Sequence, residues 1–196
     1  MTVGVGYTPG NMSDLVKHDI LKQAVGARGV DAYVEFHSGP GIHPEGYVGS
    51  PVQVLRRLRA NWNDCPVYLH ERNPELRKNL TLAIADPQFH PVTIRGDWRN
   101  SVDEYQAQAE EGWFFLIDPT KPQDYENGIL HALPWILEKG CGFLAFYPEK
   151  IAGRQGRPTF EKLMALIESS GRKVKKHEKV PVGWGKSERV DHILVV

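Results

Sequence analysis

Four acidic residues stand at or just after the ends of four short, apolar-rich segments of this 196-residue chain. They are Glu35, Glu71, Asp97 and Asp118. If each segment is a strand of one parallel sheet, the four carboxyl groups meet at a single edge, the edge where open α/β sheets bind their ligands. Each position alone also suits a turn or a helix cap. Four successive occurrences favour a shared ligand site.

Asp118 follows the most apolar of these segments, Trp113-Phe114-Phe115-Leu116-Ile117, and precedes Pro119. Five apolar residues without alternation indicate a strand that is buried on both faces. Proline has no amide hydrogen for a sheet ladder, so the strand is expected to stop at Asp118. The segment therefore predicts a buried strand that delivers a carboxylate to the ligand edge.

A Gly-Pro-Gly turn at residues 39–41 follows the first segment. Pro44 stands where a G-x-G-x-x-G fingerprint needs its third glycine, and no G-x-x-x-x-G-K-[S/T] phosphate loop occurs. A carboxylate at Glu71 suits two ribose hydroxyls, and one at Asp97 suits an exocyclic adenine amine. Adenosine without a pyrophosphate fits this set. We therefore expect S-adenosylmethionine (SAM), rather than NAD, between Gly39, Glu71 and Asp97.

The elements that must position these residues are read from apolar runs that alternate with helical segments, the pattern of a doubly wound sheet. Strands are predicted near residues 31–36, 66–70, 91–95, 112–117, 142–147, 173–180 and 189–196. Helices are predicted at about 12–25, 51–62, 74–84, 99–108, 123–138 and 158–169. The connection between the last two strands is too short for a helical crossover. We expect an α/β, Rossmann-like, mostly parallel seven-stranded sheet with a C-terminal antiparallel hairpin.

Composition is that of an ordinary globular protein, with 41% hydrophobic and 24% charged residues and a formal net charge of zero. We expect one domain over residues 1–196. The two cysteines, Cys65 and Cys141, form no metal motif and suit buried thiols in a reducing compartment. The N-terminus has no signal-like segment and no stretch is long enough to span a bilayer, so cytoplasm without a membrane partner is the expectation. Basic clusters suit either phosphate contacts or a solvated surface, and lie at Arg56, Arg57 and Arg59, at Arg154 and Arg157, and at Arg172, Lys173, Lys175, Lys176 and Lys179.

A further cluster precedes the first strand, where Asn11 or Ser13 suits the cap of a helix. Lys17 and His18 follow on adjacent turns from Asp14 and bring a cation and an imidazole toward the expected cofactor. A lone histidine such as His18 also suits a surface or core position.

Taken together, these segments resemble the large-subunit ribosomal RNA adenine-N6 methyltransferases of the J type, which fold as class I SAM-dependent enzymes. The matching pieces are Gly10-Asn11-x-x-Asp14-x-x-Lys17-His18, Tyr33 to Gly41, Gly49-Ser50-Pro51, His70-Glu71 with Pro74, Gly96-Asp97, Leu116 to Pro119, Phe146-Tyr147-Pro148 and the terminal strand. The resemblance implies Asp118 as the catalytic position. It implies cofactor contacts at His18, His37, Ser50, Glu71, Asp97 and Trp98.

Two departures separate this chain from that family. The family's Asp-Pro-Pro-Tyr motif is replaced by Asp118-Pro119-Thr120-Lys121, and a lysine offers no ring to stack on a flipped base. Tyr125 is a candidate substitute if the loop bends. The family also carries a helical insertion of several dozen residues where this chain has only Ile42 to Val48.

The function expected from these features is a SAM-dependent methyltransferase that requires no metal, with RNA as one expected acceptor. Three further interpretations stay open. The first is a catalytically idle SAM- or nucleoside-binding module. The second is a methyltransferase with a small-molecule or protein acceptor, and the third is a Rossmann-type enzyme for another adenosine-containing ligand. The oligomeric state is left open.

Overall fold

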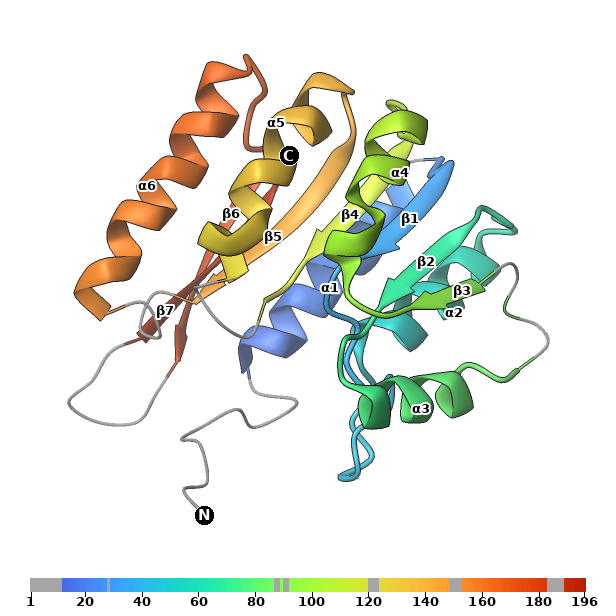
Figure 1. The fold of residues 1–196 in the computed structure, drawn as a ribbon. Helices are drawn as coiled ribbons and strands as arrows, with labels where there is room; N and C mark the ends of the chain where they lie inside the picture. The colour runs from blue at the N-terminus through green and yellow to red at the C-terminus, as the bar shows by residue number, and fades with distance from the viewer. Residues whose placement is uncertain are drawn as a thin grey trace.

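A computed structural model describes residues 12–27, 29–86, 89, 92–119, 124–148, 153–182 and 189–196. Its centre is one seven-stranded sheet in the order β3-β2-β1-β4-β5-β7-β6 (Figure 1). The strands are β1 (Ala32–Glu35), β2 (Val67–His70), β3 (Val92–Arg95), β4 (Trp113–Ile117), β5 (Gly142–Pro148), β6 (Lys176–Val182) and β7 (Arg189–Val195). The first five strands pair in parallel, and β7 runs antiparallel to both β5 and β6. The predicted fold is confirmed, including its C-terminal hairpin.

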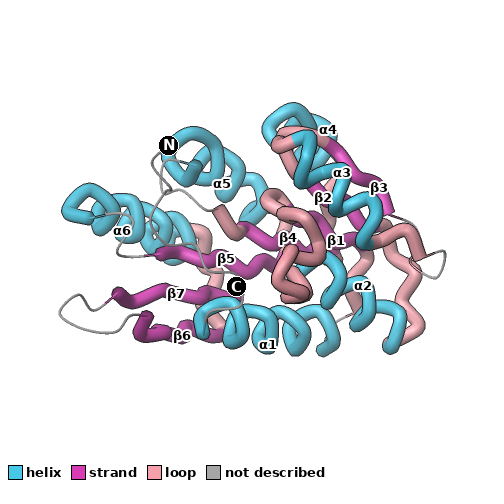
Figure 2. Tube along the Cα trace, turned by 90° about the horizontal axis from the view of Figure 1, so that it is seen from below, coloured by secondary structure: helices cyan, strands magenta, loops and turns pink. Residues whose placement is uncertain are grey.

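Within the described residues, six α-helices cover the sheet. They are α1 (Met12–Ala27), α2 (Ser50–Ala60), α3 (Pro74–Ala83), α4 (Val102–Gln108), α5 (Leu130–Glu138) and α6 (Gly153–Ser169). Figure 2 shows α1 and α2 on one side of the sheet and α4, α5 and α6 on the other. This two-sided cover explains why the central strands are continuously apolar.

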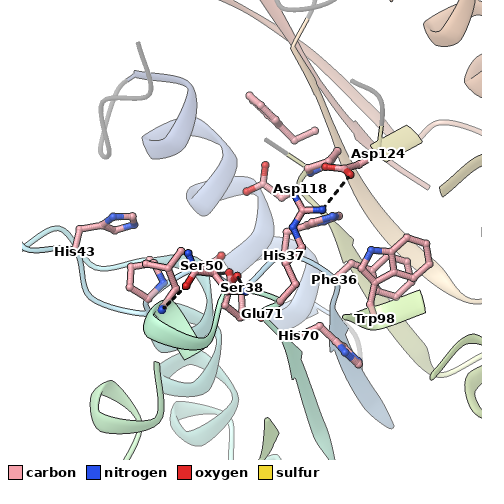
Figure 3. Close-up of a pocket in the computed structure, with 18 of the residues that line it drawn as sticks. Phe36, His37, Ser38, His43, Ser50, His70, Glu71, Trp98, Asp118 and Asp124 are labelled. Carbon is pink, nitrogen blue, oxygen red and sulfur yellow. Dashed lines mark hydrogen bonds and ion pairs between the residues drawn. The ribbon is translucent and has the colours of Figure 1, made fainter. Parts of the chain in front are cut away.

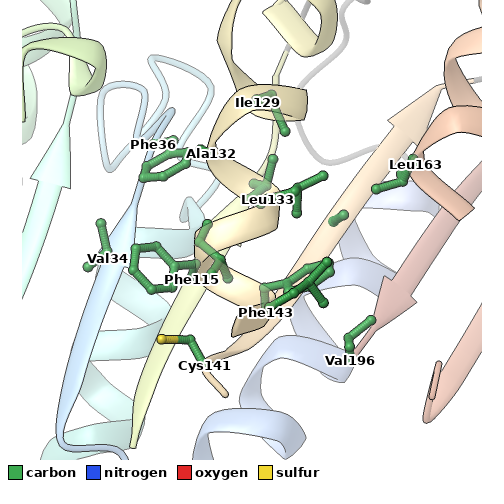
Figure 4. Packing of buried hydrophobic residues seen from close by; sticks show 14 of the residues in the cluster. Val34, Phe36, Phe115, Ile129, Ala132, Leu133, Cys141, Phe143, Leu163 and Val196 are labelled. Atoms are coloured by element: carbon green, nitrogen blue, oxygen red, sulfur yellow. The ribbon is translucent and has the colours of Figure 1, made fainter. Parts of the chain in front are cut away.

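The strands feed two cores, one on each face, because successive side chains of a strand point to opposite faces. Val34 of β1 and Phe115 of β4 pack in the core beneath α4, α5 and α6, together with Leu133 (Figure 4). Their neighbours Tyr33 and Phe114 pack in the opposite core, whose helical members include Leu21 of α1, Leu55 of α2 and Leu80 of α3. Burial of apolar side chains from both faces holds β1 and β4 at the centre of the sheet.

Two predicted helices begin with an irregular turn in the structure, and the helix predicted at 158–169 begins earlier, as α6 at Gly153. The helix predicted at 99–108 begins with a 3₁₀ turn, η1 (Trp98–Ser101), whose N-cap is Asp97. The helix predicted at 123–138 begins with a π-helical segment, η2 (Tyr125–Ile129), before α5. Both irregular turns lie beside the predicted ligand edge, where such turns often occur.

Cys65 and Cys141 are buried free thiols, as predicted. Among the described residues, no helix is long and apolar enough to cross a membrane.

Candidate functional site

A cavity of about 680 Å³ opens at the carboxyl ends of β1, β2, β3 and β4. All eight residues predicted for the site line it, which brings six separate segments of the chain around one space. Five of these residues, His37, Ser50, Glu71, Trp98 and Asp118, are labelled in Figure 3. These residues are His18, His37, Gly39, Ser50, Glu71, Asp97, Trp98 and Asp118. The sheet therefore brings together what the sequence spreads over 100 residues. The role of each residue stays a prediction.

Gly39 and Glu71 join the loops that follow β1 and β2. The Gly39 amide donates to Glu71 Oε2 at 3.0 Å, and the Asn73 amide donates to Glu71 Oε1 at 2.7 Å. Gly39 has a φ of +63°, and nothing lies within 4 Å of where its Cβ would be. Each oxygen of Glu71 holds one backbone amide and keeps acceptor capacity for a ligand hydroxyl.

Asp97 caps η1 and is bound by Arg99. The Arg99 amide and Nε donate to Asp97 Oδ1 at 3.1 and 2.9 Å, and Arg99 Nη2 forms an ion pair with Oδ2. The hydrogen bond from the Arg99 guanidinium is the main reason that the pKa of Asp97 lies below its usual value. Both carboxylate oxygens thus already have a partner, which the sequence did not indicate.

Trp98 forms a wall of the cavity rather than an exposed platform. Its ring stacks on Phe36, with centroids 4.2 Å apart and planes 7° apart, and it is 5% exposed. A Cβ at Gly128 of η2 would lie 2.8 Å from Trp98 Cη2, so glycine is needed there for the close approach. His37 contacts the edge of Trp98, and burial together with the nearby Arg72 lowers the pKa of His37 to about 3.

Asp118 is paired with a buried lysine. Lys17 Nζ forms an ion pair with Asp118 Oδ2 and a second one with Asp14 Oδ1 at 3.0 Å. Lys17 also lies over the Phe146 ring, 5.0 Å from its centroid. The Lys17 and Asp14 side chains are each 3% exposed, whereas Asp118 is 16% exposed at the cavity. The cation of α1 therefore balances the acid that follows β4 at the wall of the cavity.

Glu35 differs from the other three acids. It is fully buried and accepts hydrogen bonds from the Ser50 and Tyr33 hydroxyls instead of facing the cavity. Burial raises the pKa of Glu35 to about 8, with a smaller contribution from Asp118. Its interaction anchors Ser50, the first residue of α2, at the cavity wall.

A short hairpin stands where the resembling family has its insertion. Ile42 and Val48 form an isolated antiparallel bridge, and the His43 amide donates to the Tyr47 carbonyl at 2.9 Å. Gly46 closes the turn with a φ of +82°. His43, Pro44 and Tyr47 all line the cavity, so this connection builds part of the site.

Sequence reasoning missed several cavity residues, among them Tyr47, Arg72 and Asp124. Arg72 Nη1 lies 3.9 Å from Asp124 Oδ1, an ion pair between the loops after β2 and β4 that is drawn as a dashed line in Figure 3. No local sequence pattern marks such long-range partners. The one indication that Arg72 lies at the site was its position directly after Glu71.

Tyr125 is not a substitute for the missing aromatic residue. It is fully buried, and its hydroxyl donates to the Phe146 carbonyl at 2.5 Å. The Tyr125 ring is therefore packed in the hydrophobic core with residues of α5, where it cannot stack on a ligand in the cavity. Thr120 and Lys121 lie outside the described residues.

Within the described ranges, no group of three or more His, Cys, Asp or Glu side chains is placed to hold a metal ion. His177 Nε2 does lie 3.0 Å from His192 Nδ1 across β6 and β7, a contact that the sequence did not predict.

Comparison with known proteins gives a match at the level of structure. A scan against protein-family models and a search of the curated proteins found no match. Protein LPL1258 of Legionella pneumophila, assigned to the DUF519 family model, matches with a TM-score of 0.74 and 18% identity over 96% of this chain and 86% of that one. An rRNA methylase of Streptococcus thermophilus matches with a TM-score of 0.58 and 16% identity over 96% of both chains. Fibrillarin of Aeropyrum pernix, solved with natively bound S-adenosyl-L-methionine, matches with a TM-score of 0.56 and 12% identity over 92% of this chain and 74% of that one.

At these identities the likeness is one of fold. The chain has the α/β, Rossmann-like fold that these methyltransferase structures share, with its antiparallel strands at the C-terminal end of the sheet.

Proposed function

We propose that the protein is a SAM-dependent methyltransferase. The observation that carries the proposal is the cavity at the strand ends, where a glycine loop and the carboxylates of Glu71, Asp97 and Asp118 meet. In open α/β sheets this edge is the usual ligand site. The fold shared with methyltransferases, one of which was solved with SAM, supports the same reading.

The residues present fit such a cofactor. The open space at Gly39 leaves room for a ligand against the backbone, and Glu71 keeps acceptor capacity for ribose hydroxyls. Asp97 is expected to accept from the adenine amine while Arg99 still holds it. Trp98, His37, Ser50 and His18 complete the predicted contacts.

When bound, SAM supplies a methyl group on an activated sulfonium, so the chain's own residues mainly align the acceptor. Asp118 is the proposed orienting group, because its carboxylate reaches the cavity while the ion pair with Lys17 holds it in place. With an amine acceptor, Asp118 would accept an N–H and turn the nitrogen lone pair toward the methyl group. With a hydroxyl acceptor, Asp118 would accept the proton.

RNA is the acceptor that we favour within this proposal, by analogy with the J-type adenine-N6 family that the sequence resembles. The rRNA methylase of the same fold and the residue pattern around Asp118 support it. The short hairpin and Thr120-Lys121 favour the second candidate, an idle binding module that kept the cofactor cavity without the base-stacking ring.

Calorimetric titration with S-adenosylhomocysteine tests the proposed cofactor. We expect binding by the wild type, and a loss of about 10- to 100-fold in affinity for Glu71→Ala and for Asp97→Ala, since each removes hydrogen bonds to a charged acceptor. Asp103→Ala, an exposed acid of α4 outside the cavity, is the control and is expected to bind as the wild type does. Absence of heat with the wild type would contradict the proposal.

A further inference from the structure

His18 is held by two donors that reach the same ring nitrogen. Gln53 Nε2 lies 2.8 Å from His18 Nδ1, and the Tyr47 hydroxyl lies 2.6 Å from it. The same Gln53 nitrogen donates to the Val48 carbonyl at 2.8 Å, which fixes the orientation of the amide. An amide nitrogen can only donate, so Nδ1 accepts, and a neutral imidazole then carries its proton on Nε2.

The surroundings also keep His18 neutral. Burial lowers the pKa of His18 to about 3, and the nearby Lys17, Lys22 and His43 all oppose its protonation. The Tyr47 ring stacks on the imidazole, with centroids 5.6 Å apart and planes 16° apart. His18 is thus a neutral donor of fixed orientation at physiological pH, and Nε2 is the ring nitrogen left for a ligand because Nδ1 is already bonded.

The rest of the cavity identifies the ligand group that such a donor suits. Glu71 and Asp97 can only accept when ionised, so they suit hydroxyl and amine groups of a ligand. A donor at His18, on the α1 side of the cavity, suits a group that can only accept. On SAM such groups are the ring nitrogens of the adenine and the carboxylate of the methionyl end. Because the adenine is proposed to lie at Asp97, the carboxylate is the group left for His18.

We propose that Tyr47 and Gln53 are positioning residues that hold His18 with its Nε2–H ready to donate to the carboxylate of the cofactor. This inference rests on the proposed function, since SAM supplies the carboxylate. It gives the hairpin at residues 42–48 a role of its own, because Tyr47 comes from that hairpin.

Gln53→Glu tests the inference with one atom exchanged. The new carboxylate accepts from Nδ1, so the ring proton moves there and Nε2 becomes an acceptor that faces the ligand's carboxylate. At pH 8 we expect S-adenosylhomocysteine to bind about tenfold more weakly. 5′-Methylthioadenosine lacks the amino acid end and is expected to bind as it does to the wild type. Gln106→Glu, an exposed glutamine of α4, is the matched control.

The pH dependence of ligand affinity distinguishes a positioning role of Gln53 from a purely structural one, because only the positioning role makes affinity depend on the protonation of His18. Glu at position 53 raises the pKa of His18, so the variant's ring becomes protonated as the pH falls and Nε2 donates again. We expect the affinity of Gln53→Glu for S-adenosylhomocysteine to recover between pH 8 and pH 6. The wild type, whose His18 stays neutral, should show no such change from this group.

Nitrogen-15 NMR of the histidine ring tests the positioning without any ligand. The expected wild-type state is the Nε2–H tautomer, neutral at pH 6. If Gln53→Glu does not fold, the double variant Tyr47→Phe/Gln53→Met removes both donors, and a mixture of tautomers is then expected. An Nδ1–H tautomer or a charged ring in the wild type would overturn the positioning role.

Equal weakening of both ligands by Gln53→Glu, or unchanged binding of S-adenosylhomocysteine, would overturn the carboxylate assignment. A wild type that binds neither ligand would overturn the proposed function and that assignment together. The NMR result would still decide whether Tyr47 and Gln53 position His18.

Discussion

Asp118 is best understood together with Lys17. A lysine that is 3% exposed needs acidic partners to offset its desolvation, and Asp14 and Asp118 provide them from α1 and the end of β4. The pair therefore ties the first helix to the proposed catalytic acid. The sequence pointed to both residues, but their contact spans 101 positions and has no local signature.

Lys17→Met tests this link. The change removes the cation between two carboxylates, so we expect a loss of about 3–5 kcal/mol in the free energy of unfolding, measured with urea. Lys22→Met is the matched control on the same helix, because Lys22 also pairs with an acid three residues away but at 40% exposure. That variant should change stability by no more than about 1 kcal/mol. Similar losses in the two variants would argue against a structural role for Lys17.

Glu35→Gln tests the buried carboxyl. Burial raises the pKa of Glu35 from 4.5 to about 8, so folding favours its protonated form. This contribution is fully present below pH 4.5 and is lost as the pH rises through 8, with a slope of at most about 1.4 kcal/mol per pH unit. Glutamine does not titrate, so the wild type should lose stability relative to the variant over this interval. Urea unfolding curves that shift in parallel from pH 5 to 8 would contradict the raised pKa.

At the scale of the elements, the strands were predictable and the irregular turns were not. Runs such as residues 113–117 mark a buried strand because both faces of the sheet are covered, and Pro119 marks where it ends. The 3₁₀ turn at Trp98 and the π-helical turn at Tyr125 depend on how Trp98 packs against Gly128, a contact between distant segments. No local periodicity encodes such a contact.

Gly128→Ala tests that packing. A Cβ would meet the Trp98 ring at 2.8 Å, so either the ring or η2 must shift. We expect a loss of about 1–3 kcal/mol in stability, as for other overpacked sites, together with weaker binding of S-adenosylhomocysteine because Trp98 lines the cavity. Gly29→Ala is the control, since nothing lies within 4 Å of its Cβ position. A Gly128→Ala protein with unchanged melting temperature and affinity would show that Trp98 is not held in this way.

At the scale of the whole molecule, parallel topology explains why a site could be predicted from the sequence. Once Glu71, Asp97 and Asp118 are assigned to strand ends, the sheet must bring them to one edge. Glu35 was wrongly counted with them, because both faces of β1 are covered and its last residue is buried, where the Tyr33 and Ser50 hydroxyls donate to it. The partners Arg99, Tyr47 and Gln53 escaped prediction, since they depend on how loops fold over that edge.

The free edge of the sheet offers a test of the acceptor. Lys175 and Lys179 are exposed along the β6 edge, within the basic cluster at residues 172–179. If RNA is the acceptor, Lys175→Glu/Lys179→Glu should weaken RNA binding and flatten its dependence on salt, because fewer phosphate contacts release fewer counterions. Arg56→Glu/Arg59→Glu changes the net charge equally on exposed positions of α2. RNA affinity is measured by filter binding across salt concentrations. Equal losses of RNA affinity in the two double variants would show that the β6 edge has no specific role in RNA binding.

Transfer of a labelled methyl group from SAM is the most direct test of the central proposal. The purified protein is incubated with labelled SAM and with RNA, protein and small-molecule fractions, beside Asp118→Ala. The account predicts label in one fraction with the wild type, RNA being the favoured one, and none above background with Asp118→Ala. Absence of transfer to every fraction by a wild type that binds S-adenosylhomocysteine would contradict a methyltransferase and favour the idle binding module.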